Sequence, residues 1–251
     1  MAVLALSAGA LAWQHLDPGS VARFTGRELR PTATTTDGVR LAFPSLSVAP
    51  DSHHQFVATQ PGSSDPVAFD PCRPIHYLVR PSGELPEGDA LIADAFDRIS
   101  AASGLVFVDD GVTTEGPSPA RPNFQPERYG DRWAPVLVAW SGPQELPQLS
   151  GEVIGLTSSQ PVLADDGQLV LVSGQVALDA AQLADVVRFN GGRAVAIATI
   201  THEHGHLVGL AHVDDPRQLM YPRARSLVST FGNGDLTGLA TLGNGTCHDK
   251  L

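Results

Sequence analysis

Four of the nine histidines of the chain stand within eleven residues, in the segment HEHGHLVGLAH that begins at His202. If a helix runs through the first half of this segment, each residue advances about 100° around its axis. His202 and His206 then lie one turn apart on the same face, where both imidazoles can bind one metal ion. Glu203 lies beside that ion, and His204 points to the far side of the helix. The spacing therefore predicts two ligands, one neighbouring base and one histidine outside the site.

A third ligand requires the helix to end soon after His206. Gly209 favours such an end, because glycine adopts the left-handed conformation that terminates helices at little steric cost. The chain can then turn back and bring His212 to the ion from a loop. Three histidines and one open position are typical of catalytic zinc, whereas structural zinc sites usually have four protein ligands. Zinc lowers the pKa of a bound water to about 7, and Glu203 can accept the proton of that water.

The pattern HEHGHLVGLAH, followed by LMYP, resembles the metzincin zinc endopeptidases and, among them, most closely the matrixin branch. The resemblance implies that one catalytic Zn²⁺ is bound by His202, His206 and His212. It also implies that Glu203 is the general base that activates water. The similarity covers roughly residues 68 to 246 and is dense from residue 193 to residue 241.

Other positions near the motif also bear on the resemblance. Met220 is expected to form the tight turn beneath the metal, and Tyr221 is not expected to be a ligand in the matrixin arrangement. Val213 departs from the pattern, because matrixins often carry a serine after the third histidine. Asp235 matches an aspartate that supports the methionine turn in matrixins, and an ordinary helix cap is an equally good interpretation of this residue.

The elements that must position these residues follow from the hydrophobic pattern. Apolar residues at helical spacing predict a helix from Asp89 to Ser103, and its two flanking strands form a parallel crossover unit with it. The resemblance implies an α+β fold: a metzincin-like catalytic domain with a mixed twisted sheet, two long helices, one carrying the zinc motif, and a short C-terminal helix. The expected elements are strands at Ile75–Arg80, Leu105–Asp110, Ala134–Ser141, Gly151–Ser159 and Gln168–Asp179, a metal-binding helix from Arg193, and a closing helix near Asp235.

A protein or peptide is the expected substrate. If the fold is right, an edge strand at Val153–Thr157 lies above the zinc, and a peptide can pair with it as an added strand. A pocket beside the zinc, walled partly by residues 221 to 226, would select side chains.

The expected metal content is one zinc ion. Matrixins typically carry a second, structural zinc bound by histidines, but this chain has no histidine between His76 and His202. Structural calcium is possible, because the sequences VDDG and LADDG place paired carboxylates in loops. Aspartate–glycine turns are also common without any metal.

Two cysteines, Cys72 and Cys247, flank nearly the whole expected domain. A disulfide between them is the favoured interpretation in an exported protein. Alternatively, Cys72 in the sequence DPCRP could be a latency cysteine like those that occupy the zinc of matrixin precursors, although Arg73 replaces the glycine that follows it there. Two unpaired thiols are the remaining alternative.

Three regions are expected along the chain. Residues 1–21 contain a short apolar run that suits a signal peptide or a truncated membrane anchor, and a buried helix is the alternative. Residues 22–67, rich in proline, serine and threonine, are expected to form a linker or pro-segment. Residues 68–251 form the expected matrixin-like zinc peptidase domain.

The leading functional hypothesis is an exported zinc endopeptidase, extracellular or in the cell envelope, monomeric and with a possible N-terminal membrane tether. A net charge of −11 argues against a nucleic-acid partner. The alternative from another class is a cell-envelope binding or scaffold protein that retains a zinc site without turnover. A third reading is an intracellular peptidase with reduced cysteines.

Overall fold

The computed structural model describes residues 30–45, 49–81, 85, 87–224 and 228–251. Over these residues the chain has a mixed α/β fold with a mostly parallel six-stranded sheet and five α-helices, which is compatible with the expected α+β class. None of the described helices is long and apolar enough to cross a membrane. The expected signal peptide or anchor at residues 1–21 lies outside the described residues.

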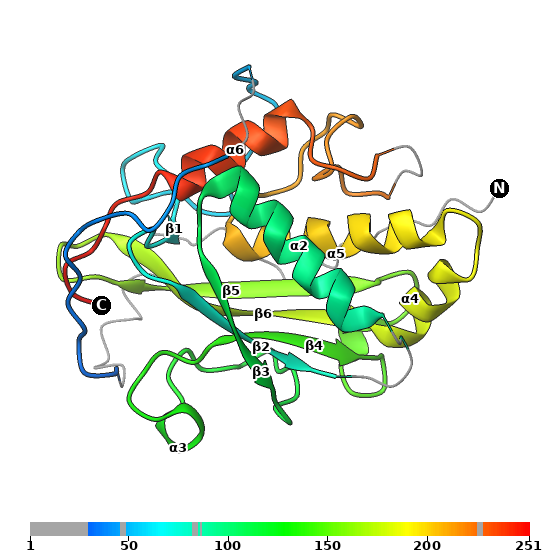
Figure 1. The fold of residues 1–251 in the computed structure, drawn as a ribbon, viewed down its shortest axis with the longest axis horizontal. Helices are drawn as coiled ribbons and strands as arrows, with labels where there is room; N and C mark the ends of the chain where they lie inside the picture. The colour runs from blue at the N-terminus through cyan, green and yellow to red at the C-terminus, as the bar shows by residue number, and fades with distance from the viewer. Residues whose placement is uncertain (1–29, 46–48, 82–84, 86, 225–227) are drawn as a thin grey trace.

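The sheet has the strand order β1-β6-β4-β2-β3 (Figure 1). Strand β5 lies outside this order and pairs with β6. Strands β1 to β4 and β6 run parallel, whereas β5 is antiparallel to β6. Strand β4, which matches the third predicted strand, lies between β6 and β2. The strands are β1 (Ala68–Phe69), β2 (Ile75–Arg80), β3 (Phe107–Val112), β4 (Val136–Ser141), β5 (Gly155–Leu163) and β6 (Leu169–Asp179).

The predicted crossover unit is confirmed, since α2 (Gly88–Ser103) connects the parallel strands β2 and β3. Its apolar residues recur at helical spacing, and they are buried in the main core. Gly104 ends the helix in the left-handed conformation, with φ 76°. Strand β3 begins at Phe107, two residues later than the sequence pattern indicated.

The long helix α5 (Gly192–Val208) lies beside α2 over one face of the sheet, next to β5 and β6 (Figure 1). It is buried on nearly all sides from Ala196 onward, which explains why its sequence has almost no polar face. The C-terminal helix α6 (Asn233–Gly243) packs against α2 and α5. A helix that the sequence analysis missed, α4 (Ala180–Val187), precedes α5. Its N-cap is Asp179, whose side chain accepts a hydrogen bond from the Gln182 backbone.

The polar segment between β3 and β4 is anchored to the sheet by a buried ion pair. Arg121 donates two hydrogen bonds of 3.0 Å to Glu115 and further bonds to Ser173 and to the backbone of Pro135. The segment also contains the short helix α3 (Pro126–Tyr129). Asn123 donates to the carbonyl oxygen of Gln160, so the loop covers the far part of the β5 edge.

Part of the expected linker or pro-segment packs on the domain. Phe56 forms an antiparallel bridge with Leu210, and the carbonyl of Gln55 accepts from the Ala211 backbone. Val57 donates to the carbonyl of Gly209, so this stretch braces the loop that follows α5. The role of residues 22–67 as a linker or pro-segment stays a prediction.

The expected disulfide between Cys72 and Cys247 is confirmed. It joins the turn before β2 to the segment after α6, across a sequence separation of 175 residues. Asp70 supports the same junction by accepting hydrogen bonds from the backbone of Cys72 and of His248. Because Cys72 is bonded to Cys247, it does not act as a latency cysteine in this structure.

We expect the double variant Cys72→Ser/Cys247→Ser to lower the free energy of unfolding by about 2–5 kcal/mol, because a crosslink over so long a loop restricts the unfolded chain. Denaturant unfolding of the metal-free protein measures this change. The histidine cluster is separate from the cysteines, so metal binding at 25 °C serves as the control for native structure. An unchanged unfolding midpoint would contradict the prediction.

Candidate metal centre

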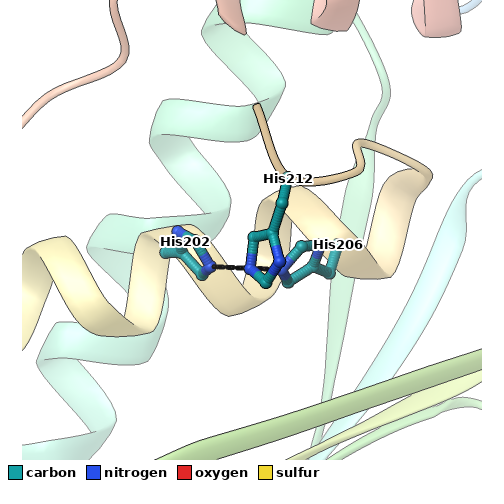
Figure 2. Close-up of side chains that lie close together, drawn as sticks. All are labelled: His202, His206 and His212. Carbon is teal, nitrogen blue, oxygen red and sulfur yellow. Dashed lines mark hydrogen bonds between the residues drawn. The ribbon is translucent and has the colours of Figure 1, made fainter. Parts of the chain in front are cut away.

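The rings of His202, His206 and His212 point toward one common position (Figure 2). The three Nε2 atoms lie 3.1 to 3.2 Å from one another. His202 and His206 extend from one face of α5, and His212 comes from the loop after it. The structure thus brings together the three residues that the sequence analysis named as ligands.

The end of α5 makes this convergence possible. Gly209 follows the helix with φ 118°, in the left-handed region that a side chain disfavours. The Leu210 backbone donates to the carbonyl of Gly205, and the chain then reverses to place His212 over the helix. The predicted helix stop at Gly209 is confirmed.

Backbone carbonyls fix the orientation of two of the rings. Nδ1 of His202 lies 2.7 Å from the carbonyl oxygen of Leu219, and Nδ1 of His206 lies 2.7 Å from that of Leu210. A carbonyl only accepts, so each Nδ1 carries the proton and each Nε2 presents a lone pair. Metal-binding histidines commonly show this second contact, because it sets the tautomer and the ring angle.

Burial keeps the imidazoles neutral. It lowers the pKa of His202 to about 4, despite the favourable contact with Leu219, and it lowers the pKa of His206 well below the ordinary value. The less buried His212 is shifted in the same direction for the same reason. Neutral rings with converging lone pairs are the protonation state that a metal ion requires.

The geometry fits a tetrahedral zinc ion. Ligand nitrogens about 2.0–2.1 Å from such an ion lie about 3.3 Å from each other, close to the separations seen here. In the tautomers fixed by Leu219 and Leu210, the Nε2 atoms of His202 and His206 cannot hydrogen-bond to each other at 3.1 Å. A cation between them would turn this repulsive contact into an attractive one. The set of three neutral imidazoles therefore fits zinc.

Glu203 is buried beneath the edge strand β5. Its carboxylate Oε2 accepts a hydrogen bond of 2.7 Å from the Thr157 hydroxyl. Its side chain also fills the space that a Cβ atom on Gly155 would occupy. Burial raises the pKa of Glu203 to about 7, and the hydrogen bond from Thr157 opposes this rise. A carboxylate with such a pKa is suited to exchange protons near neutral pH.

Met220 packs against the helix that carries the motif, and its expected role in a tight turn beneath the metal stays a prediction. It is buried, and its sulfur lies against Gly205, where a Cβ atom would come within 2.7 Å of it. Asp235 accepts hydrogen bonds from the backbone of Leu219, at 2.6 Å, and of Gly232, at 3.0 Å. Both interpretations of Asp235 therefore apply, because one carboxylate caps α6 and supports the turn before Met220.

His204 lies outside the site, as its place on the helix predicted. Its ring packs edge-on against Phe96, with ring centroids 4.4 Å apart, and its Nδ1 contacts the carbonyl of Ile200. A small hollow beside His202, about 10 Å³ in volume, is lined in part by Arg223 and Ala224, which belong to the segment expected to wall the side-chain pocket. Its lining is mostly apolar and consists of Val195, Ala198, Thr199, His202, Gln218, Leu219, Arg223, Ala224 and Val228.

Of the two aspartate pairs considered for calcium, the VDDG pair lies within strand β3 and not in a loop, and one aspartate of each pair has another partner. Asp110 accepts from His76 and from Arg132, both at 2.7 Å, and Asp166 lies 2.9 Å from the ring of His248. Calcium stays a prediction without further support.

Comparisons with known proteins leave the family open. No protein-family model and no curated protein matches the chain. A chain of the solved structure titled "GM1 bound form of the ECX AB5 holotoxin" is similar at a TM-score of 0.40 and 11% identity, over 69% of this chain and 81% of that chain. A similarity of this size carries no information about family or function.

We expect the protein to bind one Zn²⁺ per chain, and His206→Ala to weaken this binding by more than about 100-fold, because one of three converging ligands is lost. Competition with a chromogenic chelator measures the affinity. His204→Gln is the matched control on the same helix: it disturbs packing against Phe96 but leaves the ligands in place. Equal zinc affinities for His206→Ala and the unmodified protein would contradict the assignment.

Proposed function

We propose that the chain is an exported zinc endopeptidase of metzincin type, closest to the matrixin branch. In this proposal His202, His206 and His212 hold one zinc ion, and Glu203 is the general base. The observation that carries the proposal is the approach of three neutral imidazole nitrogens to within 3.2 Å of one another, with the buried Glu203 on the helix that supplies two of them. The HEHGHLVGLAH motif with Met220 supports the family assignment.

When bound, zinc supplies Lewis acidity that acidifies a water molecule and polarises the peptide carbonyl. Glu203 accepts the proton of the attacking water at its carboxylate and then passes it to the leaving amine. Burial under β5 excludes bulk water from this carboxylate and supports its role in proton transfer. The carbonyls of Leu219 and Leu210 keep two imidazoles oriented during turnover.

The edge strand β5 is the proposed binding track for substrate. Among the described strands β5 pairs with β6 alone, so its other side can add a peptide strand through backbone hydrogen bonds. The track is short. The Asn123 side chain donates a hydrogen bond to the carbonyl oxygen of Gln160, and Pro161 has no N–H to donate, so the proposed track is confined to residues 155 to 159. Side-chain selection by a pocket beside the zinc stays a prediction, because the hollow beside His202 has a volume of only about 10 Å³.

The proposed location rests on the disulfide. A bond between Cys72 and Cys247 supports an oxidising compartment outside the cytoplasm, and it argues against an intracellular peptidase with reduced thiols. The proposed catalytic domain spans residues 68–251. We infer a monomer, extracellular or in the cell envelope.

We expect Glu203→Gln to lose peptide hydrolysis by about 10²–10⁴-fold, because the carboxamide cannot accept the water proton. The variant should retain its zinc, since Glu203 is not one of the three converging ligands. Mass spectrometry of a diverse peptide library, incubated with the full chain and one equivalent of zinc, measures the cleavage. An unmodified protein that binds zinc and leaves the whole library intact would favour the scaffold alternative.

A further inference from the structure

We propose that Thr157 on β5 is a positioning residue for Glu203, and that Thr157 and Gly155 together hold the Glu203 carboxylate in one orientation. We call Thr157 and Gly155 the Glu203 seat. The proposal rests on the proposed function, in which Glu203 exchanges a proton with water. The HExxH motif gives no place to either residue, because both lie some 46 residues or more earlier in the chain.

The Thr157 hydroxyl makes two contacts with the same glutamate. Its Oγ1 lies 2.7 Å from Oε2 of Glu203 and 3.1 Å from the backbone carbonyl oxygen of Glu203. Among the described residues, Thr157 is the one hydrogen-bond donor to this carboxylate. Because a β-branched side chain has few rotamers, the hydroxyl is itself held in place.

Gly155 forms the other wall of the seat. A Cβ atom at this position would lie 2.5 Å from Cγ, 2.7 Å from Cδ and 2.8 Å from Oε1 of Glu203. Its backbone does not have a positive φ, so a turn conformation does not explain the glycine. The missing side chain instead provides the volume that the Glu203 side chain fills.

The alternation of β5 places both residues on one face. Side chains two residues apart in a strand point the same way, so Gly155 and Thr157 both face α5. Leu156, between them, points to the other face and packs in a separate apolar cluster with Leu146, Leu149, Val153 and Ala177. Two side-chain positions of β5 therefore orient the proposed base, and the backbone edge of the same strand is the proposed binding track for a peptide. The base and the substrate would then be positioned by one strand.

Crystal structures of variants test the seat without any need for activity. Thr157→Val keeps the branched shape but removes the hydroxyl, and we expect the Glu203 carboxylate to leave its present position in both the zinc-free and the zinc-loaded protein. Thr157→Ser restores a hydroxyl and should return the carboxylate. Gly155→Ala should displace Glu203 by steric contact, whereas Gly142→Ala adds the same methyl group in open space and should change nothing.

Kinetics on the same proteins test the consequence. We expect Thr157→Val to lower kcat by about 10–100-fold, because a misplaced catalytic group loses the productive geometry. KM should change much less, and Thr157→Ser should recover most of the lost kcat. Zinc affinity should stay at the unmodified value in all four variants, since neither Thr157 nor Gly155 is among the ligands.

A Glu203 carboxylate that keeps its position in Thr157→Val would overturn the inference, and so would an unchanged kcat in that variant. If the unmodified protein cleaves no peptide, the proposed function fails, and the crystallographic comparison alone then decides whether Thr157 and Gly155 hold Glu203. The two failures are therefore distinguishable.

Discussion

Nitrogens of three neutral imidazoles meet in one place, and the candidate metal centre depends on this convergence. The carbonyls of Leu219 and Leu210 hold the protons of the His202 and His206 rings at Nδ1, so both Nε2 atoms present lone pairs to a cation. Burial also keeps both rings neutral, since it lowers the pKa of His202 and of His206. The packing around the site must therefore hold both rings in this orientation.

The packing that imposes it reaches far from the histidines. The Asp235 carboxylate binds the Leu219 backbone, and the Leu219 carbonyl binds His202, so the start of α6 fixes one ring through a single intervening residue. On the other side, Phe56 bridges to Leu210, whose carbonyl orients His206. Segments before and after α5 in sequence thus converge on its two ligands. The buried helix between them has little freedom to adjust.

The features that could be predicted from the sequence are those that depend on the spacing of neighbouring residues. Helical periodicity was sufficient for α2, for the shared face of His202 and His206, and for the exclusion of His204, because 3.6 residues per turn sets all three. Gly209 revealed the end of α5 by its conformational freedom. The helix α4 was missed although Asp179 is a good N-cap, because its eight residues follow β6 without a break in apolar character.

Contacts between distant strands and helices were out of reach of that reasoning. Nothing local distinguishes Thr157 from any other threonine in a strand, and the link from Asp235 to Leu219 depends on how α6 folds back. The register of β5 decides the environment of Glu203: Gly155 pairs with Leu178 and Thr157 with Val176. A slip of one residue would exchange the two faces of the strand and put Leu156 against the carboxylate. Strand β6 is buried and pairs with both β4 and β5. The pairing of β5 with this interior strand therefore determines which residues surround the proposed base at the edge of the sheet.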